Sequence, residues 1–125
     1  MSISANGTGT IQDIALAFVA ARRLARPLPA YPGIPPRDMA TAYAVQEEAI
    51  ARWPDTIAGW KVGLVPPPLQ ADMGTNRLIG PIFQGGVVRS EGDAPVRLGA
   101  IEGGFAAIEA ELVVACAADA PEGKT

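Results

Sequence analysis

Histidine is absent from the 125 residues of this chain, and cysteine occurs once, at Cys116. Without histidine the chain cannot build a Ser-His-Asp triad, a His-activated cysteine or a zinc site of imidazole ligands from its own residues. A single cysteine cannot form an internal disulfide, which predicts a reducing, cytoplasmic compartment. Acid–base chemistry must therefore come from Lys, Asp, Glu, Tyr or Cys side chains.

A surplus of positive charge is also missing, since the formal net charge is −3. A surface that follows nucleic-acid phosphates needs an excess of Lys and Arg, so we do not expect nucleic acid as a partner. No apolar run reaches the length that crosses a bilayer, and the stretch MSISANGTGT at the start lacks the basic-then-apolar pattern of a signal peptide. We therefore expect no membrane partner either.

Two amphipathic helices are predicted in the first half of the chain. Over residues 11–26 apolar side chains recur at three- and four-residue spacing, Thr10 can cap the start, and Pro27 stops the helix. Its apolar face comprises Ile11, Ile14, Ala15, Phe18 and Val19. A second helix is predicted over residues 37–53. Its stripe, which we interpret as core, comprises Met39, Tyr43, Gln46, Ile50 and Trp53. Three arginines near the end of the first helix are interpreted as a solvated helix end: Arg22, Arg23 and Arg26.

The second half of the chain favours short strands separated by Gly and acidic turns. The predicted strands are residues 56–64, 78–90 and 94–100, with a Pro-initiated helical turn at 65–74. Helices followed by strands predict an α+β fold. We expect residues 1–56 to form a helical N-terminal region, and residues 57–125 to form the first part of a β-rich domain that is incomplete at the C-terminus.

The most apolar run, GGFAAIEAELVVACAA at residues 103–118, contains two carboxylates, Glu109 and Glu111. As a helix, the run would point the two glutamates about 200° apart, so they could not share an ion. As a strand, it would place both on one face, roughly 7 Å apart along the chain. Oxygen ligands suit a hard cation such as Mg²⁺. The residue pattern alone leaves the helix and the strand open.

A set of short tracts occurs in a fixed order along the chain: AYAVQ (42–46), IAGWKVGL (57–64), LQADMG (69–74), LIGPIF (78–83) and IEAEL (108–112). Together they resemble the 2-keto-4-pentenoate hydratase / fumarylacetoacetate hydrolase-like family over most of the chain. In that family the tract before Glu-x-Glu leads into a β-strand, and both glutamates bind a divalent metal. The resemblance therefore implies N-terminal helices packed on a mixed, β-rich fumarylacetoacetate hydrolase-like fold, with residues 57–125 as the first part of its catalytic domain. It also implies Glu109 and Glu111 as ligands of Mg²⁺ or Mn²⁺.

The resemblance also implies a catalytic role for Lys61, close to the carboxylate of a 2-oxo acid, where neighbouring positive charge would lower its pKa. The implied chemistry is enolisation of a metal-chelated 2-oxo acid. In the hydratases, which are lyases of aromatic-compound catabolism, water then adds to a 2-hydroxypenta-2,4-dienoate-type substrate. Decarboxylases of the 4-oxalocrotonate type stay open, because Leu78-Ile79-Gly80 departs from the hydratases' Asp-aromatic-Gly element. The C–C hydrolase branch ranks lower, because it activates water with a histidine.

The family's third acidic metal ligand would fall beyond Thr125. We therefore expect the chain alone to have weak or no activity. It would be a fragment of a longer product, or it would need a second polypeptide, as a homo-oligomer or with a complementing catalytic partner chain. A non-catalytic scaffold half that dimerises is an alternative, since truncated sheets expose unpaired edges. A further alternative is an unrelated small α+β domain whose glutamates are solvated.

Overall fold

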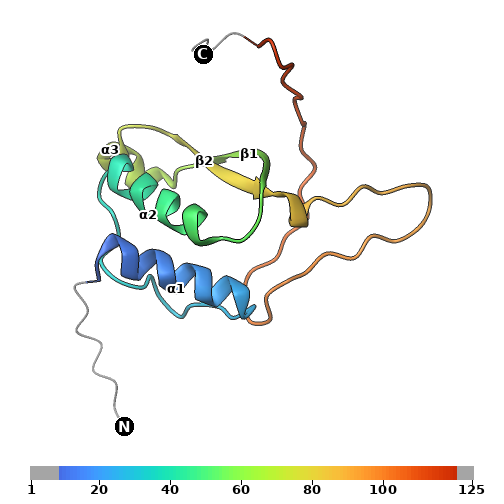
Figure 1. The fold of residues 1–125 in the computed structure, drawn as a ribbon. Helices are drawn as coiled ribbons and strands as arrows, with labels where there is room; N and C mark the ends of the chain where they lie inside the picture. The colour runs from blue at the N-terminus through green and yellow to red at the C-terminus, as the bar shows by residue number, and fades with distance from the viewer. Residues whose placement is uncertain (1–8, 121–125) are drawn as a thin grey trace.

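The structure, a computed structural model, describes residues 9–120, and its regular elements form the α+β fold that the sequence predicts (Figure 1). The helices are α1 (Ile11–Arg23), α2 (Met39–Arg52) and the single-turn α3 (Gln70–Met73), and the strands are β1 (Ile57–Leu64) and β2 (Arg77–Phe83). Short 3-10 turns cover Pro67–Leu69 and Gln84–Gly86. Within this part of the chain, no helix has the length and apolar character needed to cross a membrane.

The start of α1 is fixed by a capping box. The hydroxyl of Thr10 accepts a hydrogen bond from the backbone N–H of Asp13 at 3.2 Å, and the Asp13 carboxylate accepts one from the N–H of Thr10 at 3.0 Å. These bonds satisfy N–H groups that have no partner inside the helix. The helix ends at Arg23, three residues before the predicted end, and Ala25 has a positive φ of 48°. The predicted helix is therefore correct except for its last turn.

The core lies where α1 packs against α2 and is small. One buried cluster joins Ile14 and Ala15 of α1 to Val45 of α2, with Tyr31 and Ala49 packed against it. The buried apolar residues of the described chain are Ile14, Ala15, Val19, Val45, Val65 and Phe83. The stripe predicted as the core of α2 is only half-buried, because it faces β2 and the cavities beside it.

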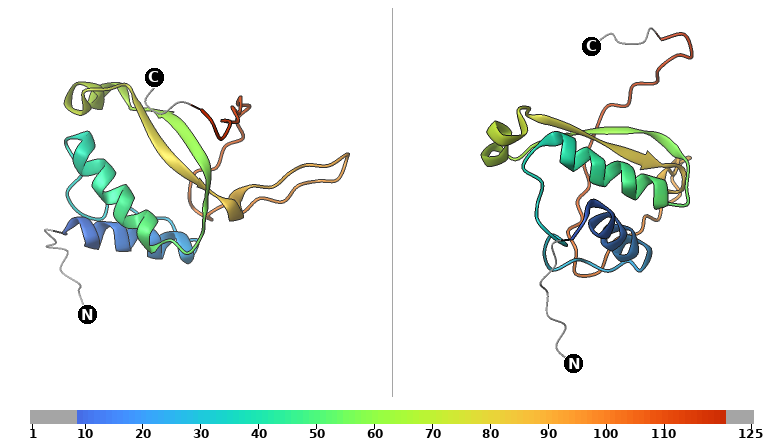
Figure 2. Two further views of the ribbon diagram at one scale, coloured as in Figure 1. Left: turned by 45° about the horizontal axis from the view of Figure 1, so that its top comes forward. Right: turned by 60° about the vertical axis from the view of Figure 1, so that its left-hand side comes forward.

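β1 and β2 form a two-stranded antiparallel sheet in which Lys61 lies opposite Gly80 and Val62 opposite Ile79. The predicted strand at 56–64 and the predicted helical turn after it are both confirmed. α2 runs beside the sheet (Figures 1 and 2). The phenol oxygen of Tyr43 accepts a hydrogen bond from the N–H of Ile79 at 3.1 Å, and the side-chain amide of Gln46 donates one to its carbonyl at 2.9 Å. A helix therefore covers the outer edge of β2.

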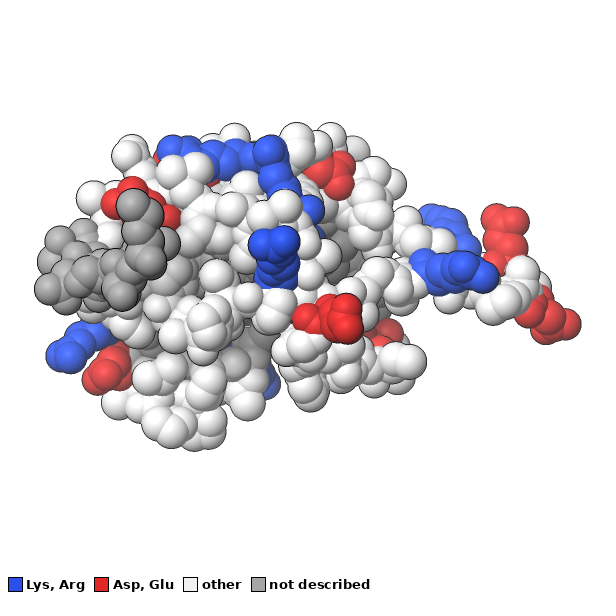
Figure 3. Space-filling view, turned by 90° about the horizontal axis from the view of Figure 1, so that it is seen from below, with Lys and Arg blue, Asp and Glu red and all other residues white. Residues whose placement is uncertain are grey.

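Residues 87–120 carry no regular secondary structure. The predicted strand at 94–100 is therefore wrong, and the one at 78–90 is correct only as far as Phe83. A strand persists when a neighbouring strand completes its backbone hydrogen bonds, and in the part of the chain described here no strand pairs with these residues. Part of the segment projects as a long loop (Figures 1 and 2), and this loop carries charges of both signs (Figure 3).

Candidate functional site

The structure brings together the three residues singled out in the sequence. The Nζ atom of Lys61 lies 3.0 Å from Oε2 of Glu109 and 2.6 Å from Oε1 of Glu111. Each contact is both an ion pair and a hydrogen bond that the ammonium donates. The two glutamates therefore face one cation, and in this structure that cation is the ammonium group of Lys61.

The strand and the segment position these side chains differently. Lys61 lies in the middle of β1 and opposite Gly80, so no side chain of the paired residue crowds it. Glu109 and Glu111 lie on the segment without regular structure, and residues 108–114 form neither a helix nor a hydrogen-bonded strand. Both carboxylates reach the same nitrogen, as alternate residues of an extended chain do. The diverging arrangement of the helical alternative is not observed.

The electrostatics of the cluster favour a charged lysine. Glu111 and, to a smaller extent, Glu109 raise the pKa of Lys61 above its ordinary value of 10.5, because both accept hydrogen bonds from the ammonium. This is opposite to the lowering that the family resemblance implies. The side chains are well exposed, at 46% for Lys61, 64% for Glu109 and 50% for Glu111. Solvent therefore screens the pairs, and they contribute little to folding stability.

The donor set fits a hard divalent cation at two positions. Carboxylate oxygens are the ligands that Mg²⁺ and Mn²⁺ prefer, and Mg²⁺ commonly uses one or two carboxylates together with water and substrate oxygens. Among residues 9–120 no third His, Cys, Asp or Glu joins the two glutamates in a group that could hold a metal. The residues that would hold the ion are therefore Glu109 and Glu111, and the third ligand that the resemblance implies is not among the described residues.

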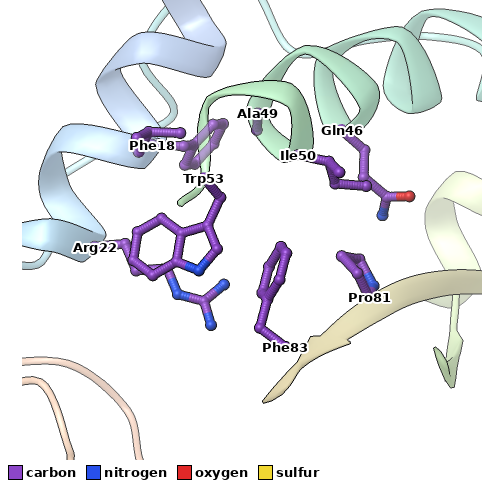
Figure 4. A pocket seen from close by; sticks show the side chains of 9 residues that line it. Phe18, Arg22, Gln46, Ala49, Ile50, Trp53, Pro81 and Phe83 are labelled. Carbon is purple, nitrogen blue, oxygen red and sulfur yellow. The ribbon is translucent and has the colours of Figure 1, made fainter. Parts of the chain in front are cut away.

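A separate cavity of about 180 Å³ lies between α1, α2 and β2 (Figure 4). The guanidinium carbon of Arg22 sits 4.5 Å from the ring centroid of Trp53 and 5.2 Å from that of Phe83. Arg22 is exposed in the last turn of α1, in agreement with a solvated helix end, and in addition it stacks on two aromatic rings, which that interpretation did not include. The sequence contains one signal for this stacking: Arg22 follows the aromatic residue Phe18 by four residues, so the two share a helix face. Lys61, Glu109 and Glu111 do not line this cavity.

Comparison with protein-family models, with curated protein sequences and with solved structures finds no match for the chain. The resemblance to the 2-keto-4-pentenoate hydratase / fumarylacetoacetate hydrolase-like family therefore stays a prediction based on the short tracts, and so do the roles it implies for Lys61, Glu109 and Glu111.

Proposed function

We propose that Lys61, Glu109 and Glu111 form the charged part of a metal-dependent site for a small 2-oxo acid, of the hydratase type. The observation that carries the proposal is the convergence of two carboxylates, two residues apart in sequence, on one cationic nitrogen at 2.6 and 3.0 Å. Alternate carboxylates that meet at one ammonium are also placed to meet at one metal ion, because both are cations that attract carboxylate oxygens, although Mg²⁺ would draw the oxygens closer, to about 2.1 Å.

The chain's own residues would divide the work in a simple way. Glu109 and Glu111 would hold the divalent cation, and Lys61, released from them, would bind the carboxylate of the substrate as a charged hydrogen-bond donor. A bound divalent cation would supply Lewis-acid stabilisation for the enolate of the 2-oxo acid. With a 2-hydroxypenta-2,4-dienoate, addition of water would give a 4-hydroxy-2-oxo acid. Decarboxylation of a 4-oxalocrotonate-type acid needs the same enolate stabilisation and is the alternative reaction.

The test combines metal binding with turnover. Purified chain is titrated with Mn²⁺ and then assayed with Mg²⁺ or Mn²⁺ for loss of the dienol absorbance of 2-hydroxypenta-2,4-dienoate. We expect weak Mn²⁺ binding that falls at least tenfold in Glu109→Gln and in Glu111→Gln, and slow turnover that both variants abolish. Glu102→Gln is the matched control, since Glu102 is an exposed glutamate on the same irregular segment. Equal Mn²⁺ binding by all four proteins would rule out the metal site.

A second function, a scaffold half that dimerises, is favoured by a different observation. Large apolar side chains of the irregular segment are almost fully exposed: Phe105 at 95%, Ile108 at 102%, Leu112 at 99% and Val113 at 92%. Several large exposed apolar side chains on one short segment are typical of association sites. Sedimentation equilibrium tests this role, for which we expect a dimer with itself; a monomer at every concentration would contradict it.

A further inference from the structure

The two edges of the sheet differ, and β1 has the open one. The N–H and C=O of Ile79 bond to Tyr43 and Gln46 of α2, so they point away from β1. In an antiparallel ladder, opposite residues alternate between pairs that exchange hydrogen bonds and pairs that do not. In a pair that does not, both residues turn their N–H and C=O groups outward. Val62, the partner of Ile79, therefore turns its own N–H and C=O away from β2.

The alternation extends this assignment along β1. Pro81 lies opposite Trp60 and has no N–H, which agrees with a pair that exchanges no hydrogen bonds. Every second residue behaves alike, so Trp60, Val62 and Leu64 all present outward N–H and C=O groups. Across residues 9–120 these groups find no backbone partner beyond the β1–β2 ladder. Their side chains are also exposed, at 51%, 61% and 57% respectively.

We propose that this edge pairs with the same edge of a second copy of the chain, antiparallel, about a two-fold axis through Val62. Val62 then lies opposite Val62 of the second copy, and Trp60 lies opposite Leu64 of the second copy, twice by symmetry. Each hydrogen-bonded pair exchanges two bonds, so the three pairs form about six. The result is a continuous four-stranded sheet with the three apolar side chains of each copy on one face.

Charge and residue size favour a second copy as the occupant. An edge lysine ordinarily blocks strand pairing, and here Lys61 is held by Glu109 and Glu111. In the proposed register Lys61 lies opposite Gly63 of the second copy, which has no side chain to clash with it. The two Lys61 residues are diagonal neighbours, about 7–8 Å apart. Each brings its own pair of carboxylates to offset the repulsion.

The proposal rests on the dimerising role given above and assigns it to the β1 edge, and it needs no metal ion, because Glu109 and Glu111 hold Lys61 when they bind no metal. A single strand edge buries little surface, below about 1,200 Å², which is the range of weak interfaces. We therefore expect association on the order of micromolar, which sedimentation equilibrium from about 1 to about 200 μM detects. A monomer throughout that range would overturn both the pairing and the dimerising role.

Cysteine cross-linking tests the register itself. In a Cys116→Ser background, Val62→Cys should form a disulfide-linked dimer on mild oxidation, because the paired Cα atoms lie about 5.5 Å apart. Leu64→Cys is the matched control on the same strand and face, with similar exposure. Its two copies would be four residues out of register, about 13 Å apart, and should not cross-link. Equal cross-linking of the two variants, or of Leu64→Cys alone, would overturn the proposal.

A backbone variant gives a second test without oxidation. Val62→Pro removes the outward N–H but leaves the β1–β2 ladder intact, so it should be folded and monomeric. Val62→Thr keeps the N–H and should still dimerise. A folded Val62→Pro dimer as strong as wild type would contradict the register, as would a dimer in which Val62→Cys fails to cross-link. In the latter case the chain would still dimerise, through another surface or by pairing a different strand with β1.

Discussion

Lys61 and Glu111 form the shorter of the two ion pairs that join β1 to the irregular segment, with 2.6 Å between Nζ and Oε1. The pair links residues 50 positions apart in sequence. It also means that a lysine occupies the point where the two glutamates would hold the proposed metal ion, so the ammonium and a divalent cation would compete for the same carboxylates.

That competition gives the first prediction. Lys61→Gln removes the competing charge, so the chain should bind Mn²⁺ several-fold more tightly than wild type while losing turnover of the dienoate. Arg97→Gln is the control for loss of one positive charge on the exposed part of the chain, and it should change neither quantity. Weaker Mn²⁺ binding in Lys61→Gln would contradict the competition.

The second prediction concerns the hydrogen bonds by which Tyr43 and Gln46 of α2 bind Ile79 of β2. Tyr43→Phe leaves the N–H of Ile79 without its acceptor and should lower the free energy of unfolding by about 1 kcal/mol. Tyr31→Phe is the matched control, because the Tyr31 hydroxyl makes no hydrogen bond to residues 9–120 although the ring is half-buried. Urea denaturation measures both. Equal losses would show that the hydroxyl of Tyr43 contributes nothing specific.

The third prediction concerns Arg22. Arg22→Met removes the cation above the Trp53 and Phe83 rings and should cost about 0.5–1 kcal/mol of stability, with a change in tryptophan emission. Arg26→Met, beyond the end of α1, should leave both readouts near wild type. An unchanged emission spectrum in Arg22→Met would place the guanidinium away from Trp53 in solution.

The fourth prediction is a loss of stability in acid. Hydrogen bonds from the N–H and then the hydroxyl of Thr41 lower the pKa of Asp38 below its ordinary value of 3.8. The hydroxyl and then the N–H of Thr10 do the same for Asp13. A carboxyl whose pKa is lowered by folding stabilises the fold above pH 3.8, and this contribution is lost as pH falls through the folded pKa. The Tm should therefore fall as the pH drops below 3.8, by a modest amount because both carboxyls are exposed to solvent.

Asp38→Asn isolates one of these contributions, because asparagine keeps a capping oxygen but does not titrate. Its Tm should be lower than that of wild type at pH 7, and the difference should close as pH falls below 3.8. A difference that stays constant down to pH 2 would show that the charge of Asp38 does not stabilise α2.

Local signals predicted the helices and the first strand well. Thr10 is the N-cap that the sequence indicates, with its side-chain hydrogen bond, and Pro54 follows the end of α2 closely. Gly74, with a φ of 67°, closes the short helical turn. Such features act over three or four residues, so a sequence displays them directly.

Features that depend on distant partners were harder to predict. The strand pattern at 94–100 forms no strand, because strand formation needs a neighbouring strand and not only β-branched residues. The bonds from Tyr43 and Gln46 to Ile79 span more than 30 residues, and so does the stacking of Arg22 on Trp53. The Glu109 and Glu111 pair was recognisable as a charged site, whereas its partner in the structure, the Lys61 ammonium, was predicted to face substrate instead.

The most direct measurement of the metal site is the broadening of backbone amide NMR signals by substoichiometric Mn²⁺. We predict that Mn²⁺ selectively broadens the amides of Glu109 and Glu111 and those beside Lys61 on the sheet, Val62 and Gly80, while Gly33 near α1 stays sharp. The effect should disappear in Glu109→Gln/Glu111→Gln. Uniform broadening along the chain, or broadening that persists in the double variant, would contradict a metal site at these glutamates.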